Sequence, residues 1–75
     1  MTDDGRLTGT LARIMLQKRF GFIRAGGHDY FVHEQDFADG SSFDTMSEGD
    51  HISFTANATP KGLRASNAVW EGART

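Results

Sequence analysis

The 75 residues allow one small domain with a thin hydrophobic core, and the absence of cysteine excludes disulfide bonds and thiolate metal sites. No apolar run is long enough to cross a bilayer and the first residues do not form a signal peptide, so we expect a reducing, cytoplasmic setting. The formal net charge of −2 argues against a protein that binds phosphate backbones mainly through its charge.

A long first strand is predicted from about Leu7 to Leu16, after a tail over residues 1–5. Its apolar residues change parity, because Leu11 falls on one side of the strand and Ile14 on the other. A β-bulge near residues 12–13 explains this change, and it supplies the bend that a small barrel needs in order to close.

Two more strands are predicted to continue the chain as a meander. A tight turn at residues 17–19 leads into a strand over Phe20–Ala25, and Gly26-Gly27 then forms a hairpin turn before a strand over Asp29–His33. The stretch from residue 34 to 49 has no strand pattern and is expected to be a long loop, with Phe37 and Phe43 either buried beneath it or at its rim.

The C-terminal part is predicted to form a second hairpin. A strand from His51 to Asn57 alternates apolar and polar residues, a turn follows at residues 59–62, and the last strand runs from Leu63 to Trp70, before a tail over residues 71–75. We therefore predict an all-β fold, a closed five-stranded antiparallel barrel over residues 6–70. Its predicted core contains Leu11, Ile23, Val32, Ile52 and Phe54.

Period two divides the second and third strands into two faces. Tyr30 and Val32 point toward the core, as does Ile23, and the opposite face carries aromatic and cationic residues, namely Lys18, Phe20, Phe22, Arg24, Phe31 and His33. Rings flanked by cations suit the stacking of unpaired bases. The alternative interpretation is that short strands are rich in aromatic residues and that some of these rings belong to the core.

Charge is segregated along the sequence. Five cations and no acid lie between Arg6 and Arg24, whereas seven acids and no lysine or arginine lie between Asp29 and Asp50. This pattern indicates either a mildly basic stripe that holds an anionic ligand or a chance distribution.

Two motifs resemble those of the bacterial cold-shock domain. Lys18-Arg19-Phe20-Gly21-Phe22-Ile23 is similar to the first ribonucleoprotein motif of that family, Lys-Gly-Phe-Gly-Phe-Ile, and Tyr30-Phe31-Val32-His33 resembles the second, Val-Phe-Val-His-Phe. The similarity covers about residues 6–69 and includes Gly9-Thr10-Leu11, Phe43-Asp44-Thr45-Met46, Glu48-Gly49 and Pro60-Lys61-Gly62, followed by Ala65 and Asn67.

The resemblance implies an oligonucleotide-binding barrel that binds single-stranded RNA or DNA, in an RNA-chaperone-like or regulatory role. We expect no enzyme activity, no cofactor and no metal, and we expect a monomer. The resemblance assigns base stacking to Phe20, Phe22, Phe31, His33 and Phe43, and phosphate contacts to Lys18 and Lys61.

Four positions depart from the family pattern. Ala12 and Arg13 replace a lysine and a stacking tryptophan, Arg19 replaces a glycine, and Glu34 replaces a phenylalanine. Arg13 can itself stack on a base and contact a phosphate. Glu34 is expected to place a negative charge near the phosphates, and Arg19 is expected to cost about 1–2 kcal/mol if its φ is positive. We therefore predict a binder with a reduced stacking surface.

The main alternative is a protein-interaction module on the same barrel, in which the remaining rings form an apolar patch for a partner chain. Catalysis and metal binding have little support. The three histidines lack the spacing of metal ligands, and Asp36, Asp39 and Asp44 are expected in a solvated loop.

Overall fold

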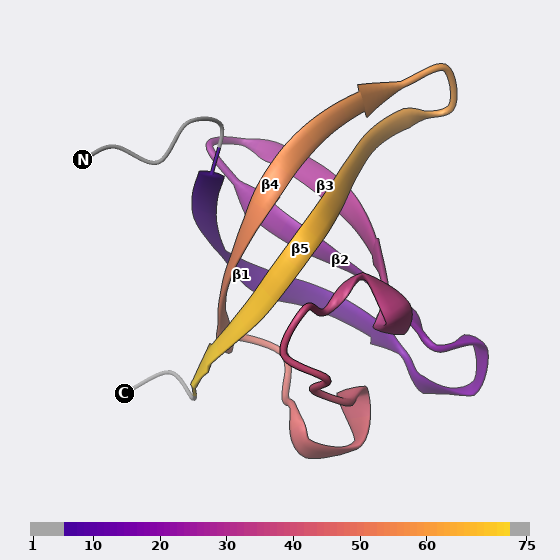
Figure 1. The fold of residues 1–75 in the computed structure, drawn as a ribbon, viewed down its shortest axis with the longest axis vertical. Coiled ribbons are helices and arrows are strands. Elements are labelled where there is room, and N and C mark those ends of the chain that lie inside the picture. The colour runs from indigo at the N-terminus through magenta and orange to yellow at the C-terminus, as the bar shows by residue number, and fades with distance from the viewer. Residues whose placement is uncertain (1–5, 73–75) are drawn as a thin grey trace.

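The computed structural model describes residues 6–72, which form a closed barrel of five strands in the order β1-β2-β3-β5-β4 (Figure 1). The strands are β1 (Arg6–Met15), β2 (Phe20–Ala25), β3 (His28–His33), β4 (His51–Thr59) and β5 (Gly62–Gly72). All five predicted strands are confirmed. β5 continues past its predicted end, so residues 71 and 72 belong to the barrel and not to a tail. The tails predicted at residues 1–5 and 73–75 lie outside the described residues.

One contact between neighbouring strands differs from the predicted antiparallel arrangement. β3 and β5 run parallel, with Phe31 opposite Arg64, whereas the other neighbouring strands are antiparallel. The reason is topological: an odd number of strands cannot alternate in direction all the way around a closed ring. The parallel contact places a cation of β5 beside the aromatic residues of β3.

The predicted bulge in β1 is present. The pairing of β1 with β2 shifts register between Leu11, opposite Ile23, and Arg13, opposite Phe22. The shift leaves Leu11 buried and Arg13 exposed. Gly21 permits the close approach of the two strands here, because a Cβ atom at this position would lie 2.5 Å from the carbonyl oxygen of Arg13.

The turn between β2 and β3 is the predicted glycine turn. Gly26 and Gly27 have φ values of 59° and 83°, the left-handed conformation that a two-residue type I′ hairpin requires at both positions. The long hairpin of β4 and β5 extends away from the rest of the barrel in Figure 1, and its turn lies at the end opposite the β3–β4 connection.

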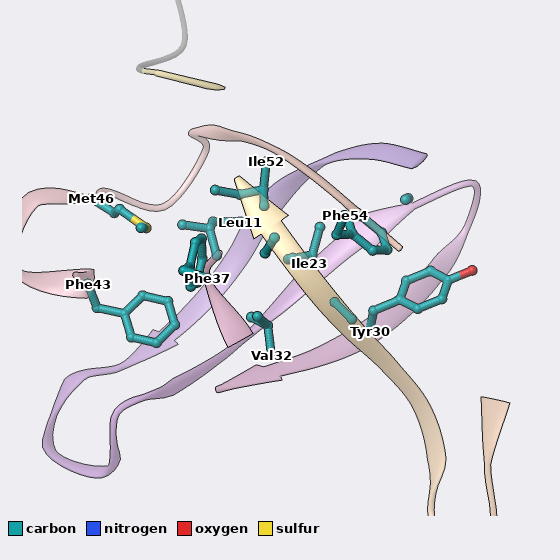
Figure 2. Close-up of a cluster of buried hydrophobic side chains, with 12 residues drawn as sticks. Leu11, Ile23, Tyr30, Val32, Phe37, Phe43, Met46, Ile52 and Phe54 are labelled. Atoms are coloured by element: carbon teal, nitrogen blue, oxygen red, sulfur yellow. The ribbon is translucent and has the colours of Figure 1, made fainter. Parts of the chain in front are cut away.

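The core forms as predicted from Leu11, Ile23, Val32, Ile52 and Phe54, each no more than 1% exposed. Figure 2 shows that these side chains converge with others from the β3–β4 connection. The complete buried apolar set also includes Ala25, Tyr30, Phe37, Phe43, Met46, Ala65 and Ala68.

The β3–β4 connection closes one end of the barrel with its own aromatic residues. It contains two short 3-10 helices, η2 (Glu34–Asp36) and η3 (Phe43–Thr45). Phe37 and Phe43 are both buried and pack edge to face, with ring centroids 5.5 Å apart. Burial acts to raise the pKa of Asp39, but hydrogen bonds from the backbone N–H groups of Ser41 and Trp70 hold that pKa below its usual value.

Within residues 6–72, no helix combines the length and the apolar composition of a membrane span. The same residues contain no cluster of three or more histidine and acidic side chains arranged to hold a metal ion.

Candidate nucleic-acid interface

Four residues of β2 and β3 form an outward-facing surface, which we call the aromatic face: Phe20, Phe22, Phe31 and His33. Phe22 is opposite Phe31 and Phe20 is opposite His33 in the antiparallel register, so all four side chains lie on one side of the sheet. They are half-buried, whereas Ile23 between the two β2 rings is fully buried. The predicted division of β2 and β3 into a core side and an aromatic side is confirmed.

The three phenylalanine rings pack against one another. The ring centroids of Phe20 and Phe31 are 5.2 Å apart, and the ring of Phe22 lies 5.9 Å from Phe20 and 6.0 Å from Phe31. Mutual packing at such distances fixes the orientation of each ring. The three rings therefore form one continuous aromatic surface on the outside of β2 and β3.

The register extends this surface over four strands. Arg13 of β1 is opposite Phe22, Phe22 is opposite Phe31, and Phe31 is opposite Arg64 of β5. We call these four residues the central row: two rings flanked by two guanidinium groups. Residues opposite each other in neighbouring strands lie on the same face of a sheet, so the cations lie beside the rings.

The backbone fixes the imidazole of His33. Its Nδ1 accepts a hydrogen bond of 3.2 Å from the N–H of Gln35, and its own backbone N–H donates to the carboxylate of Asp36 at 2.9 Å. The contact at Nδ1 orients the imidazole at the edge of the aromatic face.

Phe43 does not belong to this face. Its side chain is 2% exposed and lies in the core beside Phe37 and Met46 (Figure 2). A ring buried to this extent offers no open face for a base in this structure, which argues against the predicted stacking role of Phe43. The motif indicated an aromatic residue in the loop but not its direction, which depends on contacts between the loop and the rest of the barrel.

Glu34 and Arg19, two of the departures from the family pattern, contact each other. Arg19 adopts the left-handed conformation, with φ of 60° and ψ of 38°, as the strain argument required. Its Nη1 lies 3.3 Å from Oε2 of Glu34 and 3.2 Å from Oδ1 of Asp44. The two substitutions thus form a charged cluster at the start of the β3–β4 connection.

The carboxylate of Glu34 is turned toward the β3–β4 connection. Its Oε2 accepts hydrogen bonds from the hydroxyl of Ser42 at 3.0 Å and from the backbone N–H of Phe43 at 3.1 Å, in addition to the contact with Arg19. The expected negative charge of Glu34 is therefore present next to the aromatic face, in contact with Arg19. The charge is partly neutralised, and it anchors the segment that buries Phe43.

Folding also pairs much of the charge that is segregated in the sequence. Arg24 pairs with Asp29 and Arg64 pairs with Asp36, both at 3.1 Å, so the basic stripe is weaker than the sequence suggested. Four cations have no acidic partner within 4 Å among residues 6–72, namely Arg6, Arg13, Lys18 and Lys61. Lys18 is exposed in η1 (Leu16–Lys18), the turn that precedes the aromatic face.

An open groove adjoins the aromatic face. It has a volume of about 870 Å³ and is lined by Phe22, Asp29, Phe31 and the segment Thr59–Arg64 at the β4–β5 turn. Lys61 therefore lines the same groove as Phe22 and Phe31. Arg64 was absent from the predicted site, because its place beside Phe31 depends on which strand pair of the closed barrel is parallel and on its register.

Comparison with known proteins identifies the family to which this barrel belongs. Residues 7–70 match the family model described as the 'Cold-shock' DNA-binding domain. Cold shock-like protein CspA of Shewanella violacea is 41% identical over 64 residues, which cover 83% of this chain and 90% of that protein. Cold shock-like protein CspE of Bacillus anthracis is 38% identical over 64 residues, which cover 84% and 94% of the two chains.

A solved structure shares the fold. The structure titled drosophila Unr CSD456 aligns with a TM-score of 0.71 and 25% sequence identity, over 89% of this chain and 27% of that chain. The five-stranded barrel and the two motifs on β2 and β3 are consistent with the family match over residues 7–70. The chain belongs to the cold-shock domain family, a family of nucleic-acid-binding domains.

Proposed function

We propose that this protein binds single-stranded RNA or DNA by stacking unpaired bases on the aromatic face. The observation that carries the proposal is the set of three mutually packed phenylalanine rings that point outward from β2 and β3. Each base stacked on an aromatic side chain contributes about 1–3 kcal/mol. The summed free energy of two or three such contacts is enough for measurable binding, without a strongly basic surface.

The geometry favours single strands over duplexes. A ring stacks only on a base whose own face is exposed, and the faces of bases inside a duplex are covered by their neighbours. Duplex binding without stacking depends on phosphate contacts. Within residues 6–72, Arg19, Arg24 and Arg64 are paired with acids, and Arg13, Lys18 and Lys61 are the candidate phosphate contacts around the face that have no acidic partner.

Stacking that does not read base edges tolerates many sequences, because every base has a π-face. Binding of this kind keeps strands unpaired without selecting one target. It supports a non-enzymatic, RNA-chaperone-like or regulatory role for the protein.

Fluorescence anisotropy tests the proposal. A labelled T- or U-rich heptamer should bind saturably, and a duplex of the same length and label should bind at least about tenfold more weakly because its bases cannot stack. The matched control is the double variant Phe22→Ala, Phe31→Ala, which keeps every charge and should lose most single-strand binding. Equal affinity for heptamer and duplex contradicts the proposal.

A protein-interaction module is the second candidate. The observation that favours it is the exposure of Leu16 (47%), which follows the half-buried Ile14 and Met15 at the end of β1. Exposed apolar residues of this kind contribute to protein contacts. Failure of the heptamer to bind, together with an unchanged fold, would favour this candidate over nucleic-acid binding.

A further inference from the structure

The guanidinium group of Arg64 lies over the aromatic face. Its Cζ is 5.4 Å from the centroid of the Phe31 ring, within the range of a cation–π contact. The side chain remains 46% exposed, and the residue lines the groove together with Lys61 and Phe22. Arg64 therefore faces the surface on which the proposed ligand would lie.

Asp36 holds this guanidinium group in place. Nη2 of Arg64 donates to both carboxylate oxygens of Asp36, at 3.1 and 3.3 Å. Asp36 is itself anchored, because its Oδ2 accepts the backbone N–H of His33 at 2.9 Å in the capping box of η2. Within residues 6–72, Nε and Nη1 of Arg64 make no hydrogen bond, so two donor groups remain for a ligand.

We propose that Arg64 binds a phosphate of the single strand and that Arg64 and Arg13 flank the two rings of the central row. This proposal rests on the proposed function. Along the curved sheet, the backbones of Arg13 and Arg64 are three strand spacings of about 4.8 Å apart, with Phe22 and Phe31 between them. A strand that stacks bases on Phe22 and Phe31 then carries phosphates past a guanidinium group on each side.

A purely structural role explains the arrangement less well. Exposed ion pairs contribute little to stability. The contact with an anchored carboxylate restricts the long arginine side chain before a ligand arrives, which lowers the entropic cost of binding. The planar guanidinium group suits this position because it can lie along a ring and still donate to a phosphate oxygen.

The experiment measures the affinity of the labelled heptamer at several salt concentrations. Arg64→Gln should weaken binding about three- to tenfold, as expected for one charge-assisted hydrogen bond. It should also make the slope of log K against log salt shallower by about 0.7, the contribution of one phosphate on a single strand. Arg64→Lys keeps the charge and should retain the slope while losing part of the affinity.

Two controls separate this contact from other effects. Arg6→Gln removes the same charge from a side chain that bonds Ser53 and Asn67 beside β4 and β5, and it should leave the slope unchanged. The double variant Asp36→Asn, Arg64→Gln preserves the net charge and leaves no carboxylate at position 36 without its partner. It should bind as weakly as Arg64→Gln, and it serves as the test if the single variant does not fold.

Folded Arg64→Gln, or the double variant, with the affinity and salt slope of the parent protein would overturn the role of Arg64 alone. A heptamer that does not bind the parent protein would overturn the proposed function as well. The two failures are therefore distinguishable in the same titration.

Discussion

At the scale of single residues, the central distinction is between rings that build the core and rings that face outward. Phe54 is fully buried, and its ring lies 5.0 Å from that of Tyr30. Phe22 and Phe31 are half-buried and contact each other on the aromatic face. Rings of the same chemical type are thus expected to respond differently to truncation.

Phe22→Ala and Phe31→Ala should each weaken binding of the heptamer by about 1–3 kcal/mol, because each removes a stacking surface. Phe54→Ala should instead lower the free energy of unfolding by about 3–5 kcal/mol through a core cavity. Anisotropy and urea denaturation measure the two quantities. If Phe22→Ala and Phe31→Ala destabilise the fold as strongly as Phe54→Ala, the outward-facing rings are part of the core.

Arg13 occupies one end of the central row, at the position where the resemblance implies a stacking tryptophan. Arg13→Trp should tighten single-strand binding by about 1–2 kcal/mol, because a new stacking contact outweighs the lost cation. It should also make the salt slope shallower by up to about 0.7. The matched control is Ala12→Trp, which adds the same ring at an exposed neighbour outside the row. Equal gains of affinity in both variants, or no gain for Arg13→Trp, would contradict the placement of Arg13 in the central row.

At the scale of elements, the β3–β4 connection depends on Glu34. Its carboxylate accepts from Ser42 and from the N–H of the buried residue Phe43. Glu34→Phe introduces the ring that the resemblance implies at this position but removes the oxygen that accepts both bonds, and an unpaired buried donor costs about 1–3 kcal/mol. We expect lower stability and faster hydrogen exchange at the Phe43 amide, and not a simple gain in affinity.

Glu34→Gln is the control for charge. It keeps an acceptor oxygen for Phe43, so hydrogen exchange at that amide should stay close to the parent rate. If Glu34→Gln tightens heptamer binding as much as Glu34→Phe, then the charge of Glu34 repels the ligand and its role as a loop anchor is secondary.

The elements that could be predicted from sequence are those with local signals. The alternation in β2 and β3 identified both the core residues and the aromatic face, and the change of parity between Leu11 and Ile14 located the bulge. The contacts of the β3–β4 connection could not be predicted. The cluster of Arg19 with Glu34 and the burial of Phe43 require two loops to meet at one end of the barrel. Sequence periodicity does not predict contacts between loops.

At the scale of the whole molecule, closure of the barrel determines part of the site. The contact of Arg64 with Phe31 exists because β5 returns beside β3, which follows from strand order and not from any motif in β5. Closure also brings Asp36 to Arg64, and the hairpin turn brings Asp29 to Arg24. These pairs partly offset the positive charge that the sequence alone offered to a ligand.

The charge of the folded molecule sets the salt dependence of binding. With about three phosphates neutralised on a single strand, log K should fall with log salt at a slope of roughly −2. The measurement is the anisotropy titration of the parent protein over a range of salt concentrations. A slope steeper than about −5 would show that the cations, and not the rings, supply most of the affinity.

The most direct test of the central claim is an NMR titration of the whole chain with an unstructured T- or U-rich heptamer. Binding by stacking predicts saturable shifts at Phe20, Phe22, Phe31 and His33, with upfield ring-proton shifts where bases lie over the rings, and little change at the buried Phe43 and Phe54. The absence of saturable shifts on the aromatic face, or shifts confined to the exposed residues around Leu16, would contradict the claim that these rings bind single-stranded nucleic acid.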